Sequence, residues 1–160
     1  MRISIVSYPK RLFDKMVSEN AYGPNDKFIS IGYSFPVNDV ELGPDEPLLP
    51  ENNPCLRLLF DDVVQDVALP IIGGGTSVSK VITPEQAKQI LFFAFDIADG
   101  ATIHVHCQQG QSRSVGVAEA LTDCFKAHKI AVDVKHLNAE TNANKAVRNA
   151  ILQQYAENAL

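Results

Sequence analysis

The sequence predicts an α/β fold, in which a central, mostly parallel sheet is flanked by helices. Short apolar runs that are typical of strands alternate along the chain with longer amphipathic stretches that are typical of helices. The chain has 160 residues, of which 46% are hydrophobic, and this is enough for one compact core. No internal repeat or low-complexity tract divides the chain, so we expect a single domain over residues 1–160.

The first part of the chain contains three predicted strands and a short helix. Residues 2–6 and 28–32 carry apolar side chains at alternate positions, as strands do, and a helix around residues 12–17 joins them. The third strand covers residues 55–60. Residues 36–54 contain five prolines together with several Asp, Glu and Asn residues, which favours an ordered surface loop over a linker between domains.

The middle of the chain contains a glycine-rich segment followed by a helix. Residues 73–80, GGGTSVSK, lack the Gly-Lys-Ser/Thr ending of a nucleotide-binding loop, so we expect a mobile connection. Thr83 is a predicted N-cap, and Gln86 completes a capping box. The helix is expected to reach about Ala98 and, because apolar residues surround it, to be buried nearly all round.

The last part of the chain supplies an inner strand and two more helices. The apolar alternation in ATIHV, residues 101–105, predicts a strand inside the sheet. Apolar residues at helical spacing then predict two helices, one marked by Val117, Leu121, Cys124 and Phe125 and the other by Val147, Ile151 and Tyr155.

Charge and cysteine content narrow the classes of function. A net charge of −5 provides no basic field for nucleic acid or for an anionic membrane, so we expect neither partner. The chain has an odd number of cysteines, Cys55, Cys107 and Cys124, and their spacing is not that of a disulfide framework, which suits a reducing cytoplasm. Their spacing is not that of a zinc site either, so we expect no metal. The apolar run at the N-terminus is too short for a signal peptide or a membrane span, so we expect a cytoplasmic protein.

Cys107 is the main candidate for a chemical role. It follows the predicted inner strand, and ligands of parallel sheets bind beyond the carboxyl ends of the strands. A polar loop, Gln108–Ser112, leads from it to a helix that begins near Ser114. Backbone N–H groups of such a loop and the N-terminus of a helix together bind a phosphate-sized anion, and they also stabilise a thiolate.

Two residues near Cys107 strengthen this interpretation. Gly110 permits a positive φ or a close backbone approach in the loop. Arg113 offers a planar guanidinium that holds two phosphate oxygens at once. The remaining loop side chains are neutral, so Arg113 is the only cation of the loop. The predicted substrate-binding residues are Gln108, Gln109, Gly110, Gln111, Ser112 and Arg113.

The stretch HCQQGQSRS, residues 106–114, resembles the His-Cys-x5-Arg-Ser/Thr signature of the cysteine-dependent protein tyrosine phosphatases. The length of the chain, the helix before the signature and LRLLFDD, residues 56–62, make it similar to the compact dual-specificity branch, so the resemblance implies a dual-specificity phosphatase-like fold. ANKAVRNAIL, residues 143–152, resembles the Pro-Asn-x-x-Val segment that packs under the loop in that branch, with Ala143 in place of proline and Asn144 in a supporting position. The resemblance covers roughly residues 55–152.

The resemblance implies a two-step hydrolysis without metal or cofactor. The thiolate of Cys107 attacks phosphorus, while an aspartic acid protonates the leaving group and later activates water. Arg113 and the loop amides hold the phosphate oxygens, Ser114 hydrogen-bonds the sulfur, and His106 tunes the thiolate from behind. The expected substrate is a phosphorylated protein or a small phosphate monoester. In a protein, the phosphorylated residue is expected to be phosphotyrosine, and also phosphoserine or phosphothreonine.

The general acid has two candidates, Asp61 and Asp62, directly after the predicted strand 55–60. In the dual-specificity branch, the general acid lies a few residues beyond the corresponding strand. Aligning the ends of the two strands implies that Asp62 is this acid. Because successive extended residues alternate faces, Asp61 is then expected to point away and to anchor the loop by accepting backbone hydrogen bonds. The alternative is that the two are merely a solvated acidic pair.

Two other classes of function remain open from the sequence. A catalytically silent phosphatase-like module binds a phosphorylated partner without turnover, but such modules commonly lack the cysteine, the arginine or the acid. A rhodanese-like or arsenate-reducing enzyme also uses a thiolate in an anion pocket, but it is expected to carry a second thiol nearby. Cys124 lies on an apolar helical stripe and Cys55 at the start of a strand, so neither is well placed for that. The oligomeric state is left open.

Overall fold

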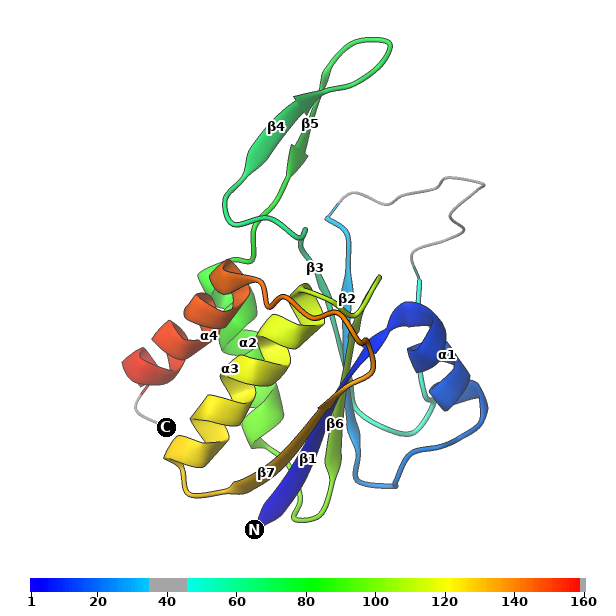
Figure 1. Cartoon of the computed structure of the whole chain (residues 1–160), viewed down its shortest axis with the longest axis vertical. Helices are drawn as coiled ribbons and strands as arrows, with labels where there is room; N and C mark the ends of the chain where they lie inside the picture. The colour runs from blue at the N-terminus through cyan, green and yellow to red at the C-terminus, as the bar shows by residue number, and fades with distance from the viewer. Residues whose placement is uncertain (35–45, 159–160) are drawn as a thin grey trace.

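The structure is a computed structural model that describes residues 1–34 and 46–158. One sheet has the strand order β3-β2-β6-β1-β7 (Figure 1). Its strands are β1 (Arg2–Pro9), β2 (Lys27–Gly32), β3 (Cys55–Leu59), β6 (Thr102–Cys107) and β7 (Ala131–His136). Every neighbouring pair in this sheet is parallel. The predicted α/β class with a central parallel sheet is therefore confirmed.

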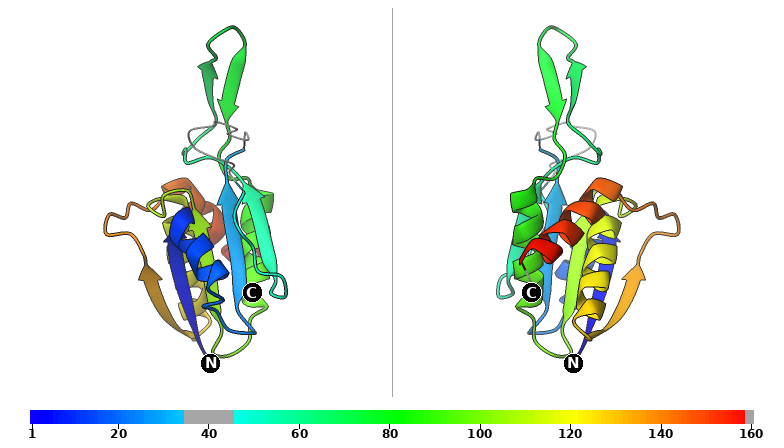
Figure 2. Two further views of the ribbon diagram at one scale, coloured as in Figure 1. Left: turned by 90° about the vertical axis from the view of Figure 1, so that its right-hand side faces the viewer. Right: turned by 90° about the vertical axis from the view of Figure 1, so that its left-hand side faces the viewer.

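Helices cover both faces of this sheet. α1 (Lys10–Ser18) lies on one face, and α2 (Pro84–Phe95), α3 (Arg113–Ala127) and α4 (Lys145–Asn158) lie on the other (Figures 1 and 2). The larger apolar core lies beneath α2, α3 and α4 and includes Ile5, Ile103 and Leu121. A smaller cluster beneath α1 is built around Phe13 and Phe28. The central strand β6 is therefore buried from both sides, as the apolar run in its sequence predicts.

The segment at residues 73–80 is not the expected mobile connection. Its second half belongs to a hairpin, in which β4 (Val67–Pro70) pairs antiparallel with β5 (Thr76–Ser79). Gly73, Gly74 and Gly75 form the turn with φ values of 97°, 110° and 88°. The glycine run is thus a turn signal, because these left-handed conformations exclude most other residues. The hairpin projects from the sheet, beyond the rest of the described chain (Figures 1 and 2).

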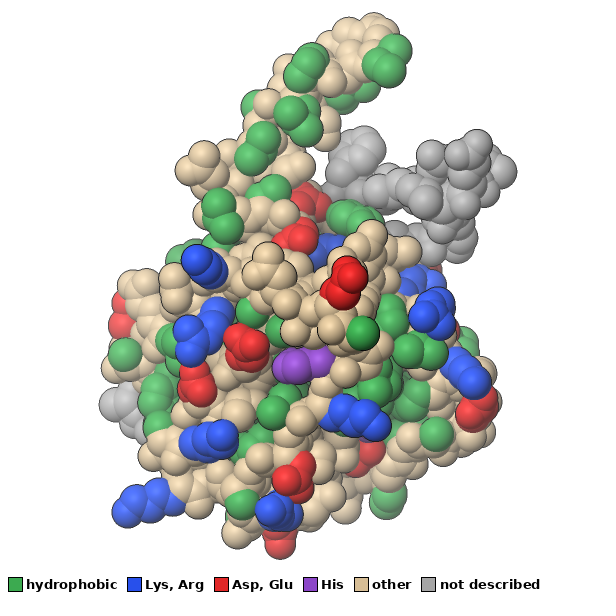
Figure 3. Space-filling view, viewed as in Figure 1, with side chains coloured by type: hydrophobic (Ala, Val, Ile, Leu, Met, Phe, Trp, Pro, Cys, Tyr) green, Lys and Arg blue, Asp and Glu red, His purple; other side chains and the backbone are tan. Residues whose placement is uncertain are grey.

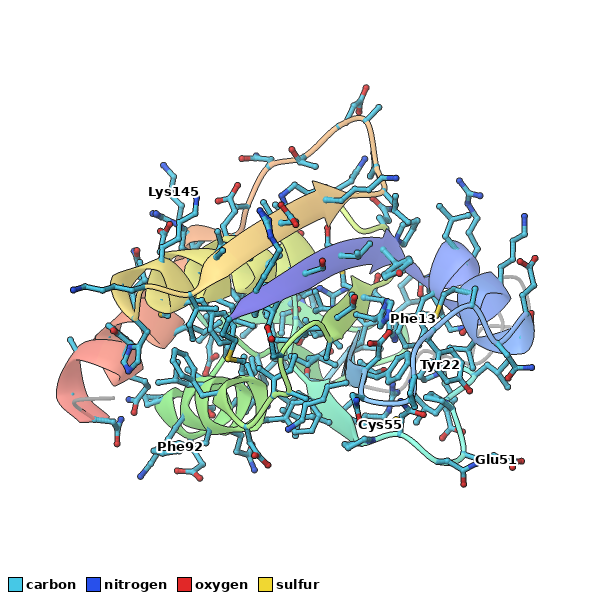
Figure 4. All side chains as sticks on the ribbon, turned by 90° about the horizontal axis from the view of Figure 1, so that it is seen from below. Phe13, Tyr22, Glu51, Cys55, Phe92 and Lys145 are labelled. Carbon is cyan, nitrogen blue, oxygen red and sulfur yellow. The ribbon has the colours of Figure 1, made fainter. Side chains whose placement is uncertain are left out.

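Helix α2 is shorter and more exposed than the sequence suggests. The predicted capping box is present, because Thr83 accepts from the backbone of Gln86 and the Gln86 side chain accepts from the backbone of Thr83. The helix ends at Phe95, and the Ala98 side chain is exposed. Phe92 is 45% exposed and points outward from the helix (Figure 4). The prediction of near-complete burial was wrong, because α2 packs against the core along one side only.

Two further regions differ from the expectation or lie outside it. We did not predict β7 from the sequence, an edge strand with mostly exposed side chains, although Val132 and Val134 alternate there with charged residues. Of the predicted surface loop, residues 36–45 lie outside the described residues, and residues 46–54 form no helix or strand. None of the helices in the described part of the chain has the length and apolar character needed to cross a membrane.

Candidate functional site

Cys107 ends the central strand β6 at the edge of the sheet where the parallel strands finish. Pro9, the last residue of β1, is its register partner. The residue is 3% exposed, and its Sγ atom lies 3.2 Å from Oγ of Ser114 and 3.3 Å from the backbone nitrogen of Gly110. The expected contact between Ser114 and the sulfur is confirmed. Two polar groups thus reach the sulfur, a hydroxyl and a backbone amide.

The loop after Cys107 is fixed by hydrogen bonds to its carbonyl groups. Backbone N–H groups of Lys10, Asn142 and Asn144 donate to the carbonyls of Gln108, Gln111 and Ser112 at 3.1, 2.8 and 3.1 Å, respectively. The Asn138 side chain donates to the carbonyl of Gln109 at 2.9 Å.

These contacts orient the amides of the loop. Because all its peptide bonds are trans, each N–H points opposite to the carbonyl of the preceding residue. The amides of Gln109, Gly110, Ser112 and Arg113 therefore point away from the supporting elements, and that of Gly110 reaches the sulfur of Cys107. Several N–H groups converging in this way form an anion-binding concavity.

Gly110 is required at its position for two reasons. Its φ is 69°, a left-handed conformation that side chains rarely adopt. A Cβ atom built at this position lies 2.4 Å from the backbone nitrogen of Pro9. The loop therefore packs directly on the junction between β1 and α1, as the sequence-based expectation of a close backbone approach at Gly110 anticipated.

Arg113 begins α3 and is 3% exposed. Its Nη1 donates to the carbonyls of Phe60 at 2.9 Å and Gly32 at 3.4 Å, at the ends of β3 and β2. The guanidinium lies over the ring of Tyr33, 4.6 Å from its centroid. Within the described part of the chain, all its hydrogen bonds use Nη1, so Nε and Nη2 can donate to an anion.

The two acidic residues after β3 have different surroundings. Asp61 is buried, and its carboxylate accepts backbone N–H groups of Ser34 at 3.0 Å and Lys80 at 2.6 Å, together with the Ser34 hydroxyl. The expectation that Asp61 anchors its loop is confirmed. Asp62 is exposed, and its Oδ1 accepts from Oγ of Ser112 at 2.7 Å and from Nδ2 of Asn144 at 2.8 Å. The pair is therefore not merely a solvated acidic cluster.

Asn144 connects three parts of the site. Besides binding Asp62, its side chain donates to the carbonyl of Val63 at 3.1 Å and caps α4 by accepting from the backbone of Val147 at 3.1 Å. Its backbone supports the loop at Ser112. Asn144 therefore supports the loop, as expected, and it also holds the carboxylate of Asp62.

His106 lies on the opposite face of β6, beneath α1. Its ring packs on Phe13, with 4.3 Å between centroids, and its Nε2 lies 2.8 Å from Oγ of Ser30. Nδ1 lies 3.3 Å from the carbonyl oxygen of Cys107. Burial lowers the pKa of His106 to about 4, so the ring is neutral at pH 7. It contacts the backbone of Cys107 behind the loop.

A pocket of about 140 Å³ opens at this loop. Most residues predicted for catalysis and substrate binding gather here: its lining consists of Tyr33, Asp62, Cys107, Gln108, Gln109, Gln111, Ser112 and Arg113. Ser114 and Gly110 do not line the pocket, but both contact the sulfur of Cys107. Tyr33 was missed in the sequence. It follows β2 directly, so the rule that ligands bind beyond strand ends could have indicated it.

The other two cysteines lie away from this pocket. Cys55 starts β3, at the end of the sheet opposite to Cys107, on the side of Phe13 and Tyr22 (Figure 4). Burial raises its pKa. Cys124 is buried within α3, and burial with the nearby charge of Asp123 raises its pKa to about 11. Both thiols are thus held in the neutral, unreactive form at neutral pH.

Comparison of the chain with protein families, curated proteins and solved structures finds no match. Within the described residues, no group of three or more His, Cys, Asp or Glu residues is arranged to hold a metal ion.

Proposed function

We propose that this chain is a cysteine-dependent phosphatase with a dual-specificity phosphatase-like fold, which hydrolyses phosphate monoesters through a cysteinyl-phosphate intermediate. One observation carries the proposal: Cys107, Arg113 and Asp62 line the same small pocket. A nucleophile, an anion-binding group and a proton donor are what this reaction requires.

In the first step, the Cys107 thiolate attacks phosphorus and the bond to the leaving oxygen breaks. Asp62 donates a proton to that oxygen, so the product leaves as a neutral alcohol or phenol. Arg113 and the inward amides bind the three other phosphate oxygens, on which charge builds up in the transition state. The position of Asp62 above the loop, held by Ser112 and Asn144, supports its role as the acid.

In the second step, Asp62 takes a proton from a water molecule that attacks the phosphorus of the cysteinyl phosphate. The S–P bond breaks, and the sulfur leaves as a thiolate. The Ser114 hydroxyl, 3.2 Å from the sulfur, donates a hydrogen bond to the departing thiolate. Inorganic phosphate is released, and the enzyme returns to its starting state without a metal or cofactor.

The substrate class follows from the charge of the loop. Its side chains other than Arg113 are neutral, so a singly phosphorylated group fits better than a polyphosphorylated inositol lipid. Phosphotyrosine is favoured, because a phenol is a better leaving group than an alcohol, and phosphoserine and phosphothreonine are slower substrates. A thiolate nucleophile suits the reducing cytoplasm, where we place the protein.

The binding-only alternative lacks support, because the cysteine, the arginine and an acid are all present at the pocket. The sulfur- or arsenate-handling alternative needs a second reactive thiol, and Cys55 and Cys124 are remote and neutral. Neither is proposed.

Cys107→Ser tests the proposal. The variant should keep the fold and lose p-nitrophenyl phosphate hydrolysis by about 10⁴-fold or more, because a hydroxyl is not ionised at neutral pH. Acid quenching of the wild type with labelled substrate should trap phosphate on Cys107. Vanadate should inhibit competitively, and a chelator should not. Near-normal turnover by Cys107→Ser would contradict the proposal.

A further inference from the structure

Two larger cavities adjoin the phosphate-sized pocket along the same loop. One, of about 450 Å³, shares the lining residues Gln108, Gln109 and Gln111 with the pocket and extends toward Arg11 and Asn138. The other, of about 470 Å³, shares Asp62 and Ser112 and extends toward the foot of the β4–β5 hairpin. The pocket therefore has a neighbouring cavity on each side, and we call the three cavities together the trough.

The two ends of the trough differ in chemistry. The end at the hairpin is walled by Val63, Val64 and Val67, and the Val64 side chain is 67% exposed. Lys145 stands at its rim and points outward (Figure 4). The other end carries the cation Arg11 and the amide of Asn138. Both ends mix polar and apolar residues, and the hairpin end is distinguished by its three valines.

The apolar wall continues along one face of the hairpin. Successive strand residues alternate faces, so Val67 and Leu69 share a face, while Val78, paired with Ala68, lies on the other. Leu69 is 55% exposed and Val78 is 37% exposed. No charged residue occurs from Val67 to Ser79, and the surface of the hairpin carries only apolar and uncharged side chains (Figure 3).

We infer that the substrate is a polypeptide in which an apolar residue next to the phosphorylated side chain lies on Val64, Val67 and Leu69. The inference rests on the proposed function, because it takes the phosphate to be bound at Cys107. A small phosphate monoester fills only the central pocket and leaves the trough empty. Exposed apolar side chains that adjoin the pocket gain free energy when an apolar peptide side chain covers them, and a carboxylate that covers them loses hydration without this gain.

The test compares two phosphotyrosyl peptides with p-nitrophenyl phosphate. One peptide carries leucine at the positions flanking phosphotyrosine, and the other carries glutamate at the same positions. The wild type should prefer the leucine peptide by roughly tenfold in kcat/KM. Val64→Asp and Leu69→Asp should each lower the ratio of leucine-peptide to p-nitrophenyl phosphate turnover by a similar factor. Val78→Asp, on the opposite face of the hairpin, is the matched control and should keep the wild-type ratio.

The outcomes separate this inference from the proposed function. If the wild type does not hydrolyse p-nitrophenyl phosphate, the proposed function fails, and anisotropy measurements of both peptides on Cys107→Ser still test the trough. The inference is wrong if the wild type hydrolyses p-nitrophenyl phosphate but does not prefer the leucine peptide. It is also wrong if Val64→Asp, Leu69→Asp and Val78→Asp all show the same preference. The inference is also wrong if Leu69→Asp changes only co-sedimentation with phosphatidylcholine–phosphatidylserine vesicles, because the hairpin then binds lipid. It is wrong as well if this variant changes only the oligomeric state, because the hairpin then binds a second copy of the chain.

Discussion

Ser112 donates from Oγ to Oδ1 of Asp62 at 2.7 Å, so the anion-binding loop itself holds the carboxylate of the proposed general acid. Asn144 donates to the same oxygen at 2.8 Å. Within the described residues, all hydrogen bonds of this side chain use Oδ1, which leaves Oδ2 for proton transfer. The geometry therefore couples the position of the proposed acid to the shape of the loop that we propose binds phosphate.

Asp62→Asn should lower kcat for a substrate with a poor leaving group by about 10²- to 10⁴-fold, the usual contribution of general acid catalysis. The loss should shrink for an activated aryl phosphate, because its leaving group needs less protonation. Rates measured over a series of aryl phosphates with leaving groups of different pKa test this.

Asp61→Asn is the matched control for that series. Its carboxylate accepts two backbone N–H groups, from Ser34 and Lys80, so the variant should lose stability by about 1–3 kcal/mol. Its effect on kcat should not depend on the leaving group. A leaving-group dependence in Asp61→Asn with none in Asp62→Asn would reverse the assignment of the acid.

Ser112→Ala removes one of the two donors to Asp62 and keeps the carboxylate itself. We expect a reduction of kcat by roughly threefold to tenfold that again grows with the pKa of the leaving group, because a single hydrogen bond contributes about 0.5–1.5 kcal/mol. The same rate series measures it. A uniform loss across all leaving groups would show that Ser112 acts on phosphate binding and not on the acid.

Arg113→Lys should lower kcat/KM by roughly 10²-fold and weaken vanadate inhibition. A lysine cannot hold the carbonyl of Phe60 and also offer two parallel donors to phosphate. Arg148→Lys is the control, because Arg148 binds Asp123 at the surface with 41% of its side chain exposed. Full activity in Arg113→Lys would mean that the phosphate is bound by the loop amides alone.

Gly110→Ala should disrupt the loop, since its Cβ lies 2.4 Å from the backbone nitrogen of Pro9 in addition to the strain of φ at 69°. Gly74→Ala shares the positive φ, at 110°, but meets no atom within 4 Å. We expect Gly74→Ala to cost about 1 kcal/mol of stability with normal turnover. Gly110→Ala should lose activity by 10²-fold or more, which kinetics and thermal unfolding of both variants can compare.

The stability of the protein should fall in acid partly through His106. Its pKa is lowered from the ordinary 6.5 to about 4 by burial, so between these values the unfolded chain binds a proton that the folded chain does not. The resulting loss of unfolding free energy is absent above pH 6.5. It grows as the pH falls to 4, where it reaches about 3 kcal/mol.

The free energy of unfolding in urea should therefore differ less between pH 7 and pH 4.5 in His106→Asn than in the wild type. This holds even if the variant is less stable than the wild type at pH 7. The exposed His128 offers a control, and His128→Asn should keep the wild-type difference. An unchanged difference in His106→Asn would assign the acid sensitivity to another group, such as His104, whose pKa is also lowered by burial.

The sequence predicted the parts of the fold that depend on strong local patterns. The inner strand at Thr102–Cys107 and the capping box at Thr83 follow from apolar alternation and from hydrogen-bonding side chains three residues apart. It did not predict the hairpin, because a glycine run fits both a turn and a mobile segment. It also missed β7, because two alternating valines in a short segment of mostly exposed residues fit a surface loop as well as a strand.

The candidate site was predicted in outline for a similar reason. The residues of HCQQGQSRS are contiguous, so their placement follows from one strand, one loop and one helix. The contact between Ser112 and Asp62 joins residues 50 positions apart, and the position of Tyr33 over Arg113 depends on how β2 lies beside β6. Such long-range pairings arise from tertiary packing, which local periodicity does not encode.

The backbone contacts of Asn142 and Asn144 with the loop have a consequence for synthesis of the protein. A ribosome makes Cys107 well before it makes these two residues, and the exit tunnel delays their folding further. A nascent chain thus carries Cys107 for a time without the segment that supports the loop after it. During that interval the carbonyls of Gln111 and Ser112 lack their backbone donors, and they gain them only after Asn142 and Asn144 have left the tunnel.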